Sequence, residues 1–181
     1  MLSKIKKVLD KFLEALVSVS MAVLVIDVVW QVFTRYVLRN PSDWTEELAT
    51  FLMIWVGLLG ASVALNRRAH LGIDYFVLKL SPKKRLYTEL LVFFCIAVFS
   101  LLVLVIGGID LVRITMQTDQ TPPALGAKIG LKMWHVYLAL PISGFFLVLY
   151  GAEFFIERIL ALLRGQFVEK PHDIESSAAA D

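Results

Sequence analysis

The residues best suited to chemistry lie four positions apart within one apolar stretch. Asp27, Gln31 and Arg35 recur at this spacing, which places them on one face of a helix. A carboxylate inside a membrane span costs about 2.5–3.5 kcal/mol on insertion scales, so it faces protein rather than lipid. One interpretation is a proton or ion relay. The other is a polar seam that fixes this helix to a neighbour, with Asp27 paired there or keeping its proton. A relay needs a second buried ionisable partner, so the sequence favours the seam.

The other candidates for catalysis or metal binding do not converge. The three histidines, His70, His135 and His172, fall in a loop, near the end of an apolar stretch and in the polar tail, so they cannot ligate one haem or metal ion. The single cysteine, Cys95, excludes an intrachain disulfide and a cysteine-built zinc site. The sequence has no phosphate-binding loop, nucleophile elbow or HExxH pattern. We therefore predict that the chain is not an enzyme and holds no cofactor.

Composition indicates the element type that must position these side chains. Of the 181 residues, 58% are apolar and 19% are charged, and the mean hydropathy is +0.72. Soluble domains are roughly 45–50% apolar and about 25% charged, and a small one cannot bury so much apolar surface. The net charge of +2 gives no reason to expect a nucleic-acid partner. The chain is predicted to be a membrane protein.

Four segments are long and apolar enough to cross a bilayer core of about 30 Å. They are residues 12–34, 47–65, 87–111 and 133–157. Because a lipid-exposed backbone must satisfy its own hydrogen bonds, these segments must be helices. The first lacks a small-residue cleavage site and is too long for a signal peptide, so it is expected to remain as an anchor. The predicted fold is an all-α integral membrane protein with four transmembrane helices in residues 1–165.

The connection between the second and third spans has a pattern of its own. Ile73, Phe76, Val77 and Leu80 form one apolar stripe at helical spacing, which predicts an amphipathic helix over residues 71–80 lying in the membrane interface. The polar residues 166–181 are predicted to be a disordered tail.

Loop charges predict the orientation. Thirteen of the 18 basic residues lie in the N-terminal segment, the second connection and the C-terminal segment. By the positive-inside rule, both termini and the second connection are cytoplasmic. Five of these basic side chains are expected to meet phospholipid headgroups: Arg67, Arg68, Lys79, Lys83 and Lys84.

Small and acidic residues predict how the helices pack. In the second span, Gly57 and Ala61, and likewise Gly60 and Ala64, stand four apart, which allows close approach of another helix. Gly144 and Gly151 are expected to act similarly in the fourth span, and Pro141 to bend it. Glu46 and Glu47 suit a helix N-terminus and follow Arg35 across a short loop, so a salt bridge is expected there. The full predicted packing set comprises Asp27, Gln31, Arg35, Glu46, Glu47, Trp55, Gly57, Gly60, Ala61 and Ala64.

Several motifs occur in an order that resembles the small membrane subunit of tripartite ATP-independent periplasmic (TRAP) transporters. They are Arg35-Tyr36, Trp44-x-Glu46-Glu47, Trp55, Gly60-Ala61, Ala64, Arg67-Arg68, His70-x-x-x-Asp74, Gln120-Thr-Pro-Pro-Ala-Leu-Gly126, Tyr137 and Leu140-Pro141-x-Ser-Gly144. The resemblance extends over nearly the whole chain but not over the tail after about Gly165.

The resemblance implies a three-part importer in the bacterial inner membrane. A periplasmic binding protein captures an organic acid, such as a C4-dicarboxylate or sialic acid. A large membrane subunit carries the substrate and sodium sites. The small subunit docks against the large one as a scaffold and binds neither ligand itself.

Two alternatives belong to other classes. A stand-alone, proton-coupled four-helix exporter of the small drug-resistance type also has an acid in its first span, a part that Glu14 or Asp27 could play. Such exporters have very short loops, whereas this chain spends about twenty residues on each of its last two. A membrane-anchor subunit of a redox enzyme would need haem-ligating histidines that converge.

Overall fold

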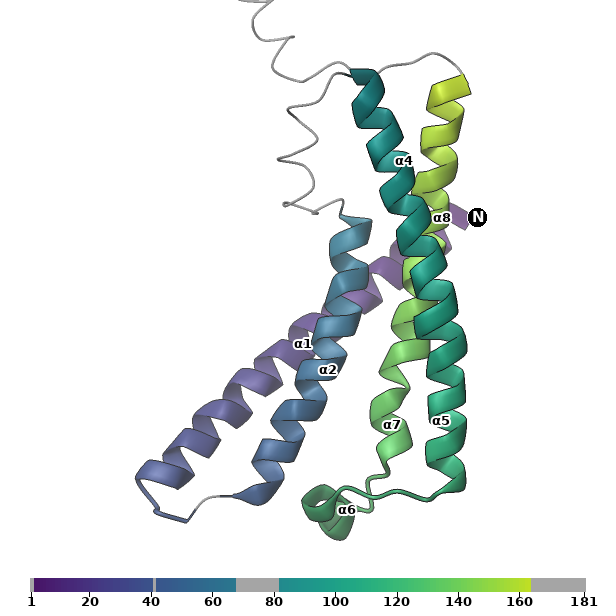
Figure 1. The fold of residues 1–181 in the computed structure, drawn as a ribbon. Coiled ribbons are helices and arrows are strands. Elements are labelled where there is room, and N and C mark those ends of the chain that lie inside the picture. Colours follow the sequence, from purple (N-terminus) through teal and green to yellow (C-terminus); the bar gives the residue numbers. More distant parts are fainter. Residues whose placement is uncertain (1, 41, 68–81, 164–181) are drawn as a thin grey trace, which may run out of the picture.

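The computed structural model describes residues 2–40, 42–67 and 82–163, which are helical apart from short connections (Figure 1). The elements are α1 (Leu2–Tyr36), α2 (Asp43–Asn66), α4 (Pro82–Phe99), η1 (Ser100–Gly107), α5 (Gly108–Gln117), α6 (Pro123–Ile129), α7 (Met133–Tyr137) and α8 (Ala139–Leu163). The predicted interfacial helix at residues 71–80, the side chains of Arg68 and Lys79, and the tail at 166–181 lie outside the described residues.

Four stretches of helix have the length and apolar composition needed to cross a membrane. They are Lys6–Tyr36, Asp43–Asn66, Leu86–Gln117 and Met133–Leu160. The predicted all-α, four-span architecture is therefore confirmed among the described residues. Three of the helical stretches run well past the apolar segments in the sequence, because hydropathy marks the part suited to lipid while the helix continues into polar residues at its ends.

The helices form two arms. α1 packs along α2, while α4, η1 and α5 pack along α7 and α8, and α2 also packs on α8. Figure 1 shows the α1–α2 arm and the α4–α8 arm meeting where α1 begins and spreading apart toward α6. We call these two regions the N-terminal end and the α6 end of the bundle.

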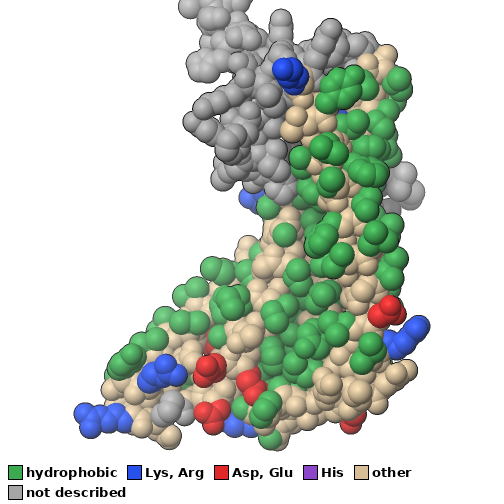
Figure 2. Space-filling model, viewed as in Figure 1, with side chains coloured by type: hydrophobic (Ala, Val, Ile, Leu, Met, Phe, Trp, Pro, Cys, Tyr) green, Lys and Arg blue, Asp and Glu red, His purple; other side chains and the backbone are tan. Residues whose placement is uncertain are grey.

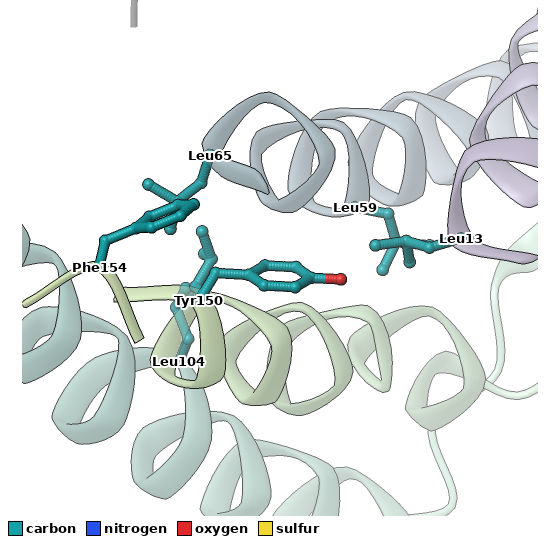
Figure 3. Close-up of a cluster of buried hydrophobic side chains, with 7 residues drawn as sticks. Leu13, Leu59, Leu65, Leu104, Tyr150 and Phe154 are labelled. Carbon is teal, nitrogen blue, oxygen red and sulfur yellow. The ribbon is translucent and has the colours of Figure 1, made fainter. Parts of the chain in front are cut away.

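The buried core lies where the two arms meet. It consists of Leu13, Leu59, Leu65, Leu104, Leu147, Tyr150 and Phe154 (Figure 3). All four spans contribute to it, since these residues come from α1, α2, η1 and α8. The surface is also largely apolar, with charged side chains gathered mainly at the α6 end of the face in Figure 2. An apolar exterior over most of the spans is what a bilayer requires of a protein surface.

The fourth span is divided at one residue, Leu138, and the bend expected at Pro141 stays a prediction. α7 ends at Tyr137 and α8 begins at Ala139. Pro141 has no N–H to donate to the carbonyl of Tyr137 four residues before it, which removes the hydrogen bond that would continue the helix. Gly144 follows on α8, where an added Cβ would lie only 2.7 Å from the Cβ of Leu104, so the predicted close approach at Gly144 is confirmed.

Candidate functional site

The polar stripe of the first span is present, but only its deeper part is buried. Asp27 is 6% exposed and lies on the face of α1 that also buries Leu13 and Thr34. That face meets α2, the helix along which α1 packs. Gln31 is half-buried and Arg35 is exposed. Among the residues that the structure describes, Oδ2 of Asp27 has no hydrogen-bond partner, so the partner expected for this carboxyl stays a prediction.

Glu47 binds the start of α6 rather than Arg35. Its Oε1 accepts a hydrogen bond from the backbone N–H of Ala124 at 2.9 Å, and its Oε2 accepts one from Leu125 at 2.8 Å. These two N–H groups belong to the first turn of a helix, where backbone donors lack intrahelical partners. A carboxylate at that position is also favoured by the helix dipole.

The expected salt bridge between Arg35 and Glu46 or Glu47 is therefore not the contact that holds the α6 end of the bundle together. No ion pair within the described ranges joins Arg35 to Glu46 or Glu47. Both oxygens of Glu47 already accept backbone hydrogen bonds, and Glu46 is exposed in the first turn of α2. The Gln120–Gly126 motif explains why α6 needs this help: Pro122 stands at its N-cap and has no side-chain donor or acceptor to cap the helix.

Further contacts fix the loop around α6. Lys132 forms an ion pair with Asp119, and the N–H of Met133 donates to the carbonyl of Gln120 at 3.0 Å. The ammonium of Lys128 lies 5.5 Å from the centre of the Trp44 ring, within the range of a cation–π contact. This loop is therefore joined both to itself and to the first turn of α2.

At the N-terminal end, three charged side chains of α1 bind residues of the neighbouring helices. Lys6, Asp10 and Glu14 are spaced four residues apart. Lys6 forms an ion pair with Glu153 of α8, and Asp10 accepts a hydrogen bond of 2.5 Å from the hydroxyl of Tyr150. Figure 3 shows the Tyr150 hydroxyl directed toward the side on which α1 lies. Sequence reasoning missed this set, although its spacing is the same signal that identified Asp27, Gln31 and Arg35.

Glu14 joins α1 to α2. Its two oxygens each lie 2.9 Å from the guanidinium of Arg67, one from Nε and one from Nη2. The hydrogen bond raises the pKa of the Arg67 guanidinium above its ordinary value, so this cation stays charged. The Arg67 side chain remains 62% exposed, and its contact with phospholipid headgroups remains a prediction.

A further ion pair joins the two helices of the other arm. Nε of Arg158 on α8 lies 2.8 Å from Oε2 of Glu89 on α4, and the two side chains are only 19% and 12% exposed. Nothing in the spacing of these residues, almost seventy positions apart, predicts the contact. Lys84, near the start of α4, is exposed, as a headgroup contact would require; the side chain of Lys83 is not described.

The small-residue face of α2 is open within this chain. Gly57 and Ala61 are exposed, and a Cβ added to Gly57 would meet nothing within 4 Å. Gly60 is half-buried, and a Cβ added to it would lie 4.0 Å from the side chain of Val17 on α1. The buried residues of α2 include Leu59 and Ser62. The Ser62 hydroxyl donates to the Ser143 carbonyl of α8 at 3.2 Å, while Trp55 and Leu58 pack against the core.

Within residues 2–40, 42–67 and 82–163, no group of three or more histidine, cysteine, aspartate or glutamate side chains is placed to hold a metal ion.

Comparisons with known proteins agree with this architecture. Residues 23–161 match the family model described as tripartite ATP-independent periplasmic transporters, DctQ component. The sialic acid TRAP transporter small permease protein SiaQ of Vibrio cholerae is 36% identical over 85 residues, 47% of this chain and 49% of that protein. The C4-dicarboxylate TRAP transporter small permease protein DctQ of Rhodobacter capsulatus is 31% identical over 100 residues, 55% of this chain and 42% of that protein.

A third relative is longer. The isethionate TRAP transporter permease protein DctMQ of Oleidesulfovibrio alaskensis is 31% identical over 100 residues, which are 55% of this chain but 15% of that protein. The chain thus spans about half the length, or less, of these relatives. The family match, in contrast, extends over most of the chain and includes the second, third and fourth spans and the last 14 residues of the first. The chain belongs to the DctQ-component family of tripartite ATP-independent periplasmic transporters.

Proposed function

We propose that this chain is the small, scaffolding membrane subunit of an importer for organic acids. The observation that carries the proposal is that polar side chains bind other helices of the same chain. Glu47, Asp10 and Glu14 each bind another helix of the same chain. Such groups position helices relative to one another, which suits a subunit that supports a transporter.

The proposed docking face lies on α2. Thr50, Met53, Gly57 and Ala61 follow one another on one side of this helix, and all four are exposed. Helix faces toward lipid gain from large apolar side chains, whereas small residues allow a second helix to approach closely. The exposed side of α1 carries large residues such as Ile26. The α2 face therefore fits a helix of the large membrane subunit.

The remaining parts of the proposal rest on the family and on the relatives. The names of the relatives refer to sialic acid, C4-dicarboxylate and isethionate, which are all organic acids. We expect sodium to bind the large subunit and to drive uptake. From the positive-inside rule we expect the N-terminal end to face the cytoplasm and the α6 end to face the periplasm, on the side of a periplasmic binding protein.

Co-purification with the large subunit tests the docking face. The variant Ala61→Leu puts a large side chain on the exposed face of α2, so it should reduce recovery of the large subunit while the small subunit still folds. Ile26→Leu, on the exposed side of α1, is the matched control and should leave recovery unchanged. Equal recovery with both variants would exclude this docking face.

The stand-alone exporter retains one supporting observation, the buried Asp27 carboxyl without a partner for Oδ2. Vesicles containing this chain alone distinguish the two functions. A scaffold should catalyse no transport by itself, whereas an exporter would move a cationic drug against a proton gradient and lose that activity with Asp27→Asn.

A further inference from the structure

The third span contains a type of helix that is rare in proteins. The π-helix η1, Ser100–Gly107, lies between α4 and α5. The backbone at Phe99 and at Gly107 and Gly108 keeps right-handed helical torsions, so the span continues through η1 without a turn. π-Helical hydrogen bonds run from residue i to i+5 rather than i+4, so one such turn holds about one more residue than an α-helical turn.

The burial pattern of the span indicates that one residue is surplus. Ser100, Gly108 and Thr115 are all buried on the side that meets the fourth span. An α-helix turns about 100° per residue, so on a plain helix Gly108 and Thr115 would lie about 80° and 60° away from Ser100. If one residue were removed between Ser100 and Gly108, Gly108 and Thr115 would lie only about 20° and 40° from Ser100, in the opposite direction around the helix. The packing of the span therefore matches a helix that is one residue shorter.

The fourth span has room for the extra turn at a single glycine. A Cβ on Gly144 would lie 2.7 Å from the Cβ of Leu104 and 3.1 Å from its carbonyl carbon. The π-helical backbone thus occupies the space that a side chain at Gly144 would need. Just beyond η1 the glycine lies on the third span instead, and the fourth span occupies the space beside it: a Cβ on Gly108 would lie 3.0 Å from Cδ of Pro141. These two close contacts hold the register between the third and fourth spans.

We propose that the third span carries one residue more than its packing against the fourth span requires, and that η1 holds this residue so that α5 keeps its register. α5 leads directly into the loop that carries α6. The extra residue therefore also determines where that loop begins, and with it the position of the backbone groups that Glu47 binds.

Two single-residue deletions in the same span test the proposal. Val103 lies in η1 with a side chain 48% exposed, and Leu91 lies in α4 with a side chain 62% exposed. Deletion of Val103 should convert η1 to an α-helix and leave the residues on both sides in place. Deletion of Leu91 should rotate the following residues of α4 by about 100° and move Phe93 and Ile96 away from the core.

The readout is thermal unfolding of the full-length chain purified in detergent, together with its elution as a single species. The chain without Val103 should melt within about 4 °C of the parent chain. The chain without Leu91 should lose its cooperative transition. Equal damage from the two deletions would overturn the proposal, and so would tolerance of the Leu91 deletion.

A second measurement tests the role of Gly144 separately. In the parent chain, Gly144→Ala should lower the melting temperature, because the added methyl group meets the backbone of Leu104. In the chain without Val103 the same substitution should cost less, since the π-helical turn no longer fills that space. An equal fall in both backgrounds would show that η1 does not depend on the gap at Gly144.

Discussion

Replacing Glu47 should release the start of α6 from the first turn of α2. Glu47→Ala removes two hydrogen bonds, of 2.9 Å and 2.8 Å, from a carboxylate to backbone N–H groups. A hydrogen bond to a charged group contributes about 1.5–3 kcal/mol, and loss of a helix N-cap costs about 0.5–2 kcal/mol. The site is part-buried, so water can replace some of the lost contact. We expect a net local cost of about 1–3 kcal/mol.

That cost converts into a rate of amide exchange. A free energy of about 1–3 kcal/mol corresponds to about a 5- to 150-fold change in the equilibrium for local opening. Hydrogen exchange followed by mass spectrometry should therefore show the amides of Ala124 and Leu125 exchanging faster by this factor. Amides of α8 around Leu147 should be unaffected, since they lie in the core.

Two variants sharpen the experiment. Glu47→Gln keeps one carbonyl oxygen that can accept a hydrogen bond, so its exchange rates should lie between those of the parent chain and Glu47→Ala. Glu46→Ala removes the neighbouring, exposed acid and should change nothing at α6. The reasoning would be refuted if Glu47→Ala left these amides protected, or if Glu46→Ala exposed them equally.

Two further substitutions test the other polar contacts of α1. Tyr150→Phe removes the hydroxyl that donates to Asp10 and should destabilise the detergent-purified chain by about 1–3 kcal/mol, or roughly 2–12 °C in melting temperature; an unchanged melting temperature would contradict a structural role. Asp27→Asn keeps the shape of the side chain, so under the proposed function sodium-driven uptake by the chain reconstituted with its two proposed partners should be largely retained. Loss of uptake with assembly intact would instead place the Asp27 carboxyl in the coupling mechanism.

Much of the fold was predictable because helices that cross a membrane need long apolar segments, which are visible in the sequence. Long apolar segments mark the four spans, and Gly144 marks the close approach in the fourth span. These features depend on the local sequence and on the solvent around it. They need no knowledge of which helix lies beside which.

The contacts between helices were harder to predict, because they depend on the arrangement of the two arms. Arg35 and Glu47 are close in sequence and opposite in charge, yet the nearest unsatisfied donors to Glu47 are backbone groups almost eighty residues away. No contact between Glu14 and another helix was predicted, since its partner Arg67 becomes adjacent only when α1 and α2 pack antiparallel. The π-helix left no signal in the residue types, only in the burial pattern.

The positions of the polar contacts suggest what the chain maintains. At the N-terminal end, Asp10 and Lys6 bind α8, and at the α6 end Glu47 binds the loop that follows α5. Both sets connect the α1–α2 arm to the α4–α8 arm, one at each end of the apolar core. In a bilayer, apolar packing alone gives little drive for helices to hold one angle, since lipid tails are as apolar as the side chains. Two separated sets of directional hydrogen bonds fix that angle, and a fixed angle keeps the proposed docking face of α2 in one orientation.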